Sequence, residues 1–399
     1  MPASPRYAVL RVLLLGGLAL VLGVAGAAEE PSKAGSRQII QSGIEAMPKG
    51  AQPALPGRGL VQSTISAVAS ELMKEVPPLD KPFHLKICIF DLMGRNGPVF
   101  SIAQDVALEA KRWNVYAELI PFTNESVAAN SFKVGACDAV GMSTLRARNF
   151  NFFMGSFDAV GALMTYEEVK TAITALMGSD RMYEKSINHP YQIVGMAPLG
   201  AAYVMVNDRA INSIEKAAGK KVAVLEWDTS QAKMVQQIGA QPVASDISNF
   251  AQKFNNGVVD IIAAPALAYG PFELYRGLGT KGAVFDLPLA MVTGSAVINR
   301  TKFEKEIPDL DEKIKKLRKF GLRFLDQGIE VIRKLEKVVP ERYWMTLGPE
   351  EKIKYMRMMD QARAQLTAEG VYSPEMMKFL LRVRCKHTPT LAECSNRSE

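Results

Sequence analysis

The sequence predicts an α/β fold of two lobes, with a long helix that braces both lobes and extra helices at the C-terminus. Residues 219–275 show the order strand, helix, strand, helix, strand with short connections, which is typical of a parallel sheet covered by helices. The same order of elements occurs over 85–142. The segment FKVGACD at 132–138 ends a helix and starts a strand there, and it matches the segment FNNGVVD at 254–260. After Pro308 the apolar residues follow a helical period.

Residues 1–27 have the features of a cleavable secretory signal peptide. Arg6 and Arg11 precede the apolar run 12–26, and residues 25–27 provide an A-x-A cleavage site. An uncleaved membrane anchor is the alternative, but the run is short and interrupted by glycines. We expect a protein that is exported to the periplasm.

Charge and composition favour a globular protein without a nucleic-acid partner. The whole chain has a formal net charge of +7, and 48% of its residues are hydrophobic, which is enough for a sizeable core. Loss of Arg6 and Arg11 with the signal peptide leaves about +5, and the charges are interspersed along the chain. The densest basic run, 313–319, lies on a predicted helix that also carries acids, and we interpret it as a solvated helix face.

The four cysteines form two groups. Cys385 and Cys394 lie close together near the C-terminus, where a disulfide would close a small loop in an exported protein. Cys88 and Cys137 lie in apolar, strand-like runs, and either two buried thiols or a cross-strand disulfide fits them. No spacing of cysteine and histidine resembles a zinc site, so we expect no metal and no cofactor.

Caps, glycine stops and periodicity set the limits of the expected elements, as in the capping box that Thr165 and Glu168 form before a helix. Strands are expected at 85–90, 114–120, 138–142, 192–196, 202–206, 222–225, 241–243, 258–263 and 289–299. Helices are expected at 60–76, 99–112, 166–177, 308–335, 349–370 and 374–384. Three further helices are expected: one that ends at residue 133, one from residue 229 to the stop at Gly239, and one from the cap Asp246 to Gly257.

The expected organisation follows from these elements, with the strand at 289–299 returning to the first lobe. Its parts are the signal peptide at 1–27, an N-terminal extension at 28–82, lobe I at 83–206 and 289–307, lobe II at 207–288, and the long helix with the C-terminal helical segment at 308–399.

Polar side chains follow two strand ends of the first lobe. In parallel sheets ligands bind beyond the carboxyl ends of the strands. Arg95 and Asn96 follow the first strand, where they can donate hydrogen bonds to an anion or a carbonyl; the alternative is an ordinary surface turn. Thr144 and Arg146 follow the strand that ends at residue 142, and we expect Arg146 in a cleft and Arg148 in solvent.

The second lobe adds further candidates. Glu226, Trp227 and Asp228 directly follow a strand, so Trp227 is either an aromatic plate for a ligand or an ordinary packing residue. Asp228 is also a candidate helix N-cap, and that role alone would explain why an aspartate occupies this position. Tyr269 and Glu273 lie one helical turn apart after another strand, where they either line the cleft or pack in the ordinary way.

The catalytic motifs of common enzyme classes are absent from the sequence. It contains no G-x-S-x-G, no H-E-x-x-H and no phosphate-binding loop, and its three histidines fall outside the strand ends. These observations favour binding over catalysis.

The signal peptide, the two α/β units, the segments GKKVAV (219–224) and FNNGVVD (254–260), and the long late helix together resemble the extracytoplasmic solute receptors of TRAP transporters (DctP-like). The resemblance covers roughly 83–335 and is strongest with a subgroup of uncharacterised predicted solute-binding proteins. It implies a type II periplasmic-binding-protein fold that closes on its ligand, with the long helix bracing both lobes, and delivery of the solute to membrane permease subunits.

One position departs from the pattern of that family. The family typically has an arginine in a G-x-K-[IV]-R-[VI] strand that binds the ligand carboxylate, and this chain has Ala223 there. An alanine cannot form that bond, so Arg95 or Arg146 takes over the role, or the ligand is not an ordinary carboxylate.

We therefore expect a monomeric periplasmic protein that captures a small organic solute between its lobes without catalysis. One alternative is an envelope accessory protein that keeps the fold and has lost ligand binding. The other is an exported enzyme on the same scaffold.

Overall fold

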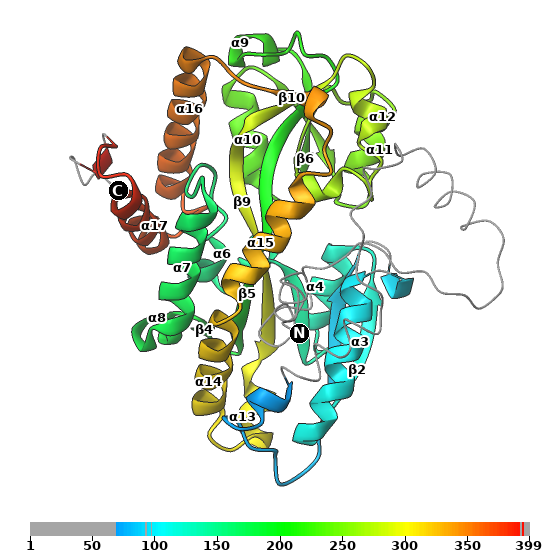
Figure 1. The fold of residues 1–399 in the computed structure, drawn as a ribbon, viewed down its shortest axis with the longest axis vertical. Coiled ribbons are helices and arrows are strands. Elements are labelled where there is room, and N and C mark those ends of the chain that lie inside the picture. Colours follow the sequence, from blue (N-terminus) through cyan, green and yellow to red (C-terminus); the bar gives the residue numbers. More distant parts are fainter. Residues whose placement is uncertain (1–68, 92–93, 97, 392, 395–399) are drawn as a thin grey trace, which may run out of the picture.

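The computed structural model describes residues 69–91, 94–96, 98–391 and 393–394. A ten-stranded sheet is the central element of this part of the chain. The predicted signal peptide and most of the helix predicted at 60–76 lie outside these residues. The main strand order is β2-β1-β3-β9-β5-β8-β6-β7, and helices surround the sheet in two lobes (Figure 1).

Lobe I contains the first predicted α/β unit. Its β1 is parallel to both β2 and β3, as the strand–helix alternation predicts. The predicted capping box of Thr165 and Glu168 is present at the start of α7. The elements of this part are β1 (Phe83–Phe90), η3 (Gly94–Asn96), α3 (Pro98–Ala110), η4 (Lys111–Trp113), β2 (Val115–Phe122), α4 (Glu125–Lys133), β3 (Ala139–Ser143), α5 (Thr144–Ala147), α6 (Phe152–Gly155), α7 (Tyr166–Gly178), α8 (Asp180–Lys185) and β4 (Ile187–Asn188).

Lobe II contains the second unit, in which β6 is parallel to β7 and β8. Asp228 is the N-cap of α10, and its side chain accepts a hydrogen bond from the backbone N–H of Ser230. The elements are α9 (Ile214–Ala217), β6 (Lys221–Leu225), α10 (Thr229–Gln237), β7 (Gln241–Ser245), α11 (Phe250–Asn255), β8 (Ile261–Pro265), η5 (Ala266–Ala268) and α12 (Tyr275–Leu278).

Two long antiparallel strands, β5 (Tyr191–Val206) and β9 (Ala283–Asn299), run through both lobes. The two strands predicted at 192–196 and 202–206 are therefore one strand, which corrects the expectation. The apparent gap between them contains Pro198 and Gly200, and the β5–β9 register shifts between these two residues. Proline and glycine are tolerated at such bulges, so they did not end the strand.

The single long helix predicted at 308–335 is two helices in line, α14 (Leu310–Leu322) and α15 (Leu325–Glu336), after the short α13 (Arg300–Glu306). At the break, the N–H of Arg323 binds the carbonyl of Phe320 and the N–H of Phe324 binds that of Gly321, so the ladder tightens to i→i+3 bonds. Together α14 and α15 run from lobe I to lobe II (Figure 1), which is the bracing arrangement that the sequence predicts.

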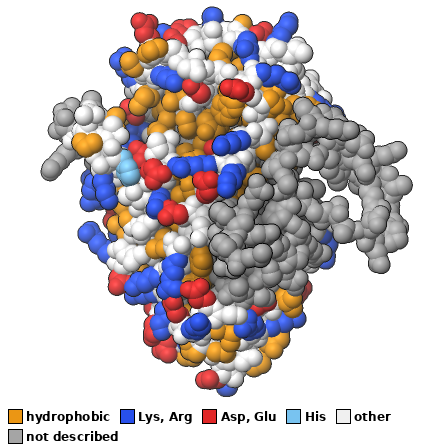
Figure 2. Space-filling model, viewed as in Figure 1, with side chains coloured by type: hydrophobic (Ala, Val, Ile, Leu, Met, Phe, Trp, Pro, Cys, Tyr) orange, Lys and Arg blue, Asp and Glu red, His pale blue; other side chains and the backbone are white. Residues whose placement is uncertain are grey.

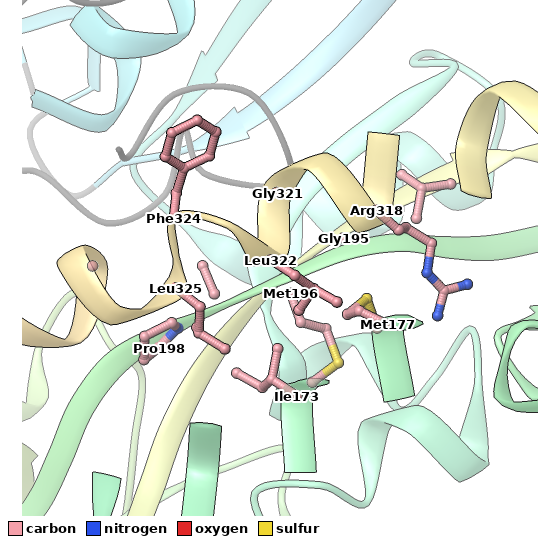
Figure 3. A pocket seen from close by; sticks show the side chains of 13 residues that line it. Ile173, Met177, Gly195, Met196, Pro198, Arg318, Gly321, Leu322, Phe324 and Leu325 are labelled. Carbon is pink, nitrogen blue, oxygen red and sulfur yellow. The ribbon is translucent and has the colours of Figure 1, made fainter. Parts of the chain in front are cut away.

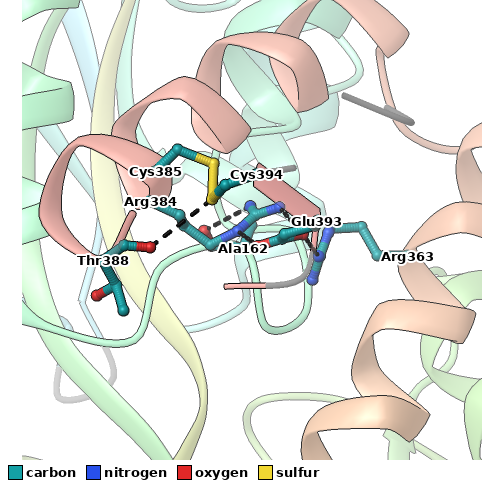
Figure 4. Close-up of a disulfide and its surroundings, with 7 residues drawn as sticks. All are labelled: Ala162, Arg363, Arg384, Cys385, Thr388, Glu393 and Cys394. Carbon is teal, nitrogen blue, oxygen red and sulfur yellow. Dashed lines mark hydrogen bonds and ion pairs between the residues drawn. A yellow bond between two sulfur atoms is a disulfide. The ribbon is translucent and has the colours of Figure 1, made fainter. Parts of the chain in front are cut away.

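The C-terminal segment adds helices close to those predicted at 349–370 and 374–384. It consists of η6 (Glu341–Tyr343), β10 (Trp344–Met345), α16 (Pro349–Ala368) and α17 (Pro374–His387). Cys385 is bonded to Cys394, the pairing favoured from the sequence, and Figure 4 shows its surroundings. Cys88 is bonded to Cys137, so a disulfide is present rather than two thiols, and it joins β1 to the segment directly before β3.

The surface agrees with the interspersed charge of the sequence. Figure 2 shows basic and acidic side chains mixed over the visible face, with apolar side chains between them. Among the described residues, the helices lack the length and apolar character needed to cross a membrane.

Candidate functional site

The ends of β3 and β6 meet where lobe I contacts lobe II. After β3, the hydroxyl of Ser143 caps α5 by accepting the backbone N–H of Arg146 at 3.1 Å. After β6, the chain turns through Glu226 and Trp227 into α10. The helix starts are therefore fixed by local caps, which hold Arg146 and Trp227 at the facing ends of their strands.

Arg146 of lobe I lies over the indole ring of Trp227 of lobe II. The guanidinium carbon is 3.7 Å from the ring centroid, close to the optimum for a cation–π contact. Arg146 also donates to the Ser126 hydroxyl and forms an ion pair with Glu125, whose carboxylate oxygen lies 3.8 Å from Arg146 Nε. Only 6% of Arg146 is exposed, so this charge is held inside the contact between the lobes.

Arg148 is paired rather than solvated, which corrects the expectation. Its Nη2 donates to Asp228 Oδ1 at 3.0 Å, and Asp228 is 1% exposed. The guanidinium of Arg148 also faces the ring of Tyr372, 5.6 Å from its centroid, from the segment between α16 and α17. The C-terminal helices thus contribute directly to the contact between the lobes.

Several buried polar atoms in this contact lack a hydrogen-bond partner among the described residues: Glu125 Oε2, Arg146 Nε, Arg148 Nη1 and Trp227 Nε1. Burial raises the pKa of Glu125 above its ordinary value and lowers the pKa of Arg146 below its own. Buried groups are normally hydrogen-bonded, so this concentration of unsatisfied atoms marks a place that can accept a polar ligand.

Thr144 faces the crossing strand β9. Its hydroxyl lies 2.6 Å from that of Ser295 and 2.8 Å from that of Thr293. Thr293 in turn lies 2.7 Å from Asp158 Oδ1, and its backbone N–H binds Asp158 Oδ2 at 2.9 Å. The Thr293 hydroxyl donates to Asp158 Oδ1, so both bonds from Thr293 to this carboxyl group favour its ionised form. Burial outweighs them and raises the pKa of Asp158 to about 7.

Asp158→Asn is expected to make the stability less dependent on pH, because a buried amide is neutral at every pH in this range and binds no titrating proton. Between about pH 4 and pH 7 the folded chain keeps a proton that the unfolded chain releases, so stability falls as the pH rises. One pKa unit corresponds to about 1.4 kcal/mol, so the fall amounts to at most about 4 kcal/mol. Urea unfolding across this range should show a flatter profile for the variant and greater stability than the wild type near pH 8.

The matched control for this prediction is Asp326→Asn, since the Asp326 side chain is 66% exposed. It should leave the pH profile of the wild type unchanged. Parallel profiles for Asp158→Asn and the wild type would show that Asp158 is already ionised throughout the range.

The other predicted residues lie in different surroundings. Glu226 is exposed beside Trp227 and acts electrostatically on Arg146. Arg95 and Asn96 are exposed on η3, after β1. Tyr269 is 4% exposed and packs against Tyr275 and Tyr343 inside lobe II, with centroid distances of 6.0 and 6.1 Å.

Four residues of the contact were not expected from the sequence as site residues: Glu125, Ser126, Asp246 and Tyr372. Asp246 follows β7 and contributes to the electrostatic environment of both Arg146 and Glu125. It was predicted only as a helix cap. The position of Asp246 beyond a strand end was the signal that could have marked it, whereas Tyr372 lies outside the α/β units and carried no such signal.

A separate apolar hollow lies between α7, β5 and the break between α14 and α15 (Figure 3). Its charged lining residue is Arg318, which donates to Ser186 Oγ and to the Leu176 carbonyl. Burial lowers the pKa of Arg318 to about 10. The residues that line this hollow include the aromatic Phe324 and no carboxylate, in contrast to the Arg146–Trp227 contact. Within the described residues no group of histidine, cysteine and carboxylate side chains is arranged to bind a metal.

Comparison with known proteins identifies solute-binding relatives. The family described as "Solute-binding protein AdeT 1/2" matches residues 114–399. The probable solute-binding protein AdeT1 of Acinetobacter baumannii is 42% identical over 313 residues, which cover 78% of this chain and 100% of AdeT1. AdeT2 of the same organism is 25% identical over 241 residues, or 60% of this chain and 98% of AdeT2.

Solved structures share the fold at low identity. A TRAP periplasmic solute-binding protein from Ralstonia eutropha H16 with bound (S)-2-acetolactate has a TM-score of 0.62 at 15% identity and covers 76% of this chain and 99% of its own. The sugar acid binding protein DctPAm from Advenella mimigardefordensis in complex with galactonate has a TM-score of 0.62 at 13% sequence identity and covers 77% of this chain and 99% of its own. The TRAP periplasmic solute-binding protein from Haemophilus influenzae RdAW with bound L-gulonate has a TM-score of 0.61 at 12% sequence identity and covers 75% of this chain and 99% of its own. These similarities establish the two-lobed fold.

Proposed function

Since this chain belongs to the solute-binding protein family AdeT 1/2, we propose that it captures a small organic solute at the contact between its lobes and delivers it to the membrane subunits of a TRAP-type transporter. The observation that carries the proposal is the contact of Arg146 with Trp227, one from each lobe. A solute bound there touches both lobes and so links binding to their closure.

The residues proposed to meet the solute are those at the two strand ends. Trp227 offers a half-buried aromatic face, and Glu226, Asp228 and Arg146 surround it with charge. Thr144 supports this group from behind through its bonds to β9. Arg95 and Asn96, which are exposed on η3, remain candidates, while Tyr269 supports lobe II by packing.

The proposed setting is the periplasm, after removal of residues 1–27, with the chain acting as a monomer. Capture and release require no bond to be broken, which agrees with relatives that are described as solute-binding proteins. The membrane permease is the partner to which a closed, loaded receptor would dock.

A thermal-shift screen of the refolded mature chain, residues 28–399, tests the proposal directly. Organic acids belong in the panel because structural relatives carry galactonate, gulonate and acetolactate, and amino acids, sugars and amines extend it. A solute at a hundred times its Kd stabilises the folded state by about 2.7 kcal/mol, which is readily visible as a rise in Tm. A well-folded chain that no class of solute stabilises would contradict solute capture.

Trp227→Ala is expected to abolish the rise in Tm caused by a solute, while the fold stays intact because Trp227 is only half-buried. The matched control is Tyr116→Ala, which removes an aromatic ring stacked on His84 in lobe I. That variant should keep the full response to the solute. An unchanged response in Trp227→Ala would remove this residue from the site.

A further inference from the structure

We propose that the solute carries a positively charged nitrogen group, an ammonium or guanidinium, which takes the place on Trp227 that Arg146 holds in this structure. The inference rests on the proposed function, since it names the class of solute bound at the same contact between the lobes. Three observations lead to it: the balance of charge, the stacked cation and the unsatisfied buried atoms.

The contact between the lobes carries more negative than positive charge. The carboxylates that act electrostatically on Arg146 are Glu125, Asp246, Asp228 and Glu226. The cations among them are Arg146 and Arg148, which pair with Glu125 and Asp228 respectively. Asp246 and Glu226 then remain as excess negative charge, which attracts a cation and repels an anion.

A nearby lysine offsets part of this excess. Lys253 donates to the Ala244 carbonyl and the Ser245 hydroxyl, which are neutral acceptors directly before Asp246, so its charge partly compensates Asp246 and leaves Glu226 as the excess carboxylate. On β6, Ala223 offers no charge and packs against the apolar core of lobe II. The contact therefore lacks the cation that an arginine at position 223 would supply.

The stacked pair shows what the contact accepts. The guanidinium carbon of Arg146 lies 3.7 Å from the centroid of the indole ring, and four carboxylates act electrostatically on this cation, a combination that proteins use to bind organic cations. Arg146 supplies that cation from within the chain. It follows that Arg146 and a cationic solute compete for one place.

The unsatisfied buried atoms are the third observation, and they indicate a cationic solute independently of the other two. Glu125 is 1% exposed, and its Oε2 has no hydrogen-bond partner; the 3.8 Å to Arg146 Nε is too long for one. This oxygen can accept an N–H from a solute cation. Trp227 Nε1 and Arg148 Nη1 are unsatisfied donors, so the solute also carries acceptor oxygens close to its cationic nitrogen.

Competition between Arg146 and the solute gives the sharpest test. In Arg146→Ala, ethylguanidinium should raise Tm in proportion to its concentration and should bind about tenfold more tightly than to the wild type. Propionate, which has a similar size and the opposite charge, should have no such effect. The double variant Arg146→Ala/Trp227→Ala should lose the response to ethylguanidinium.

A matched set of solutes separates this inference from the proposed function. Cadaverine, aminovalerate and glutarate share one carbon chain and differ in the charge at its ends. A Trp227-dependent rise in Tm with cadaverine, or with aminovalerate but not with glutarate, supports a cationic solute. A Trp227-dependent rise with glutarate and none with cadaverine keeps solute capture and overturns the cationic class.

The remaining outcomes also decide the question. If propionate stabilises Arg146→Ala as well as ethylguanidinium does, the place on Trp227 is not selective for cations and the inference fails. If neither probe stabilises the variant and the full panel leaves the wild type unchanged, both the inference and solute capture at this contact are overturned.

Discussion

Substitution of Glu393 by alanine is expected to lower the free energy of unfolding by about 4 kcal/mol, the cost typical of removing one partner from a buried ion pair. The carboxylate of Glu393 accepts from Arg384 Nε at 2.6 Å and Nη2 at 2.7 Å, and from Arg363 Nη2 at 3.3 Å (Figure 4). Arg363 and Arg384 are 0% and 3% exposed. Loss of their shared carboxylate leaves two buried cations with less compensation.

The effect should extend beyond the C-terminus. Arg363 also donates to the Val160 carbonyl and Arg384 to that of Ala162, in the segment that follows Asp158. The disulfide lies next to both partners in sequence, since Cys385 follows Arg384 and Cys394 follows Glu393. It thereby holds the carboxylate against the arginines, and the pair anchors the C-terminal helices to lobe I.

Urea unfolding at neutral pH measures this effect, with Glu330→Ala as the control. Glu330 pairs with Lys334 on α15, and both side chains are half-exposed, so its loss should cost less than about 0.5 kcal/mol. Although burial acts to raise it, the two arginines hold the pKa of Glu393 below its ordinary value. The difference between variant and wild type should therefore shrink as the pH falls below about 4. Equal stability of Glu393→Ala and the wild type would refute the anchoring role.

Local patterns were sufficient to predict the frame of the candidate site. Asp228 at the start of α10 and the capping box of Thr165 at α7 involve residues within one helical turn, so the sequence encodes them directly. Alternation of strands and helices then placed Trp227 and Arg146 beyond strand ends. What these residues touch was not encoded locally.

The contacts that define the chemistry join distant parts of the chain. Arg148 and Asp228 are 80 residues apart, and Asp158 and Thr293 are 135 apart. Their meeting depends on how β5 and β9 cross between the lobes, which hydrophobic periodicity does not specify. A charged residue such as Arg148 was assigned to solvent because an unpaired charge avoids burial, and its partner could be found only in three dimensions.

The break between α14 and α15 was missed for a related reason. Apolar residues continue at helical spacing across it, so periodicity alone predicts one helix. Phe320 and Phe324 pack against each other at 5.1 Å, and i→i+3 bonds replace the regular ladder there. The helix is interrupted in its backbone hydrogen bonds, whereas the spacing of its apolar side chains is not interrupted.

Gly155→Ala is expected to lower the free energy of unfolding by about 3 kcal/mol or more, the upper range for overpacking. A Cβ at residue 155 would lie 2.1 Å from the Cα of Arg148 and 2.4 Å from its backbone nitrogen. Backbone atoms cannot rotate away as a side chain can, so α5 and α6 must separate. Since Arg148 pairs with Asp228 across the lobes, the variant should also weaken the response of Tm to a bound solute.

Gly348→Ala is the matched control for this substitution. Nothing lies within 4 Å of a Cβ at that position, and its φ of −60° suits any residue, so the cost is limited to the poorer N-cap that alanine gives α16, about 1 kcal/mol or less. Arg148→Ala removes the ion pair without forcing the helices apart, and it leaves the buried carboxylate of Asp228 without its cation, so it should also lower stability. If the close approach of α5 and α6 positions Arg148, then both variants should weaken the solute response, and the double variant should weaken it no further than Arg148→Ala does. A Gly155→Ala variant that unfolds at the urea concentration of the wild type would show that the helices separate at little cost and that Gly155 does not position Arg148.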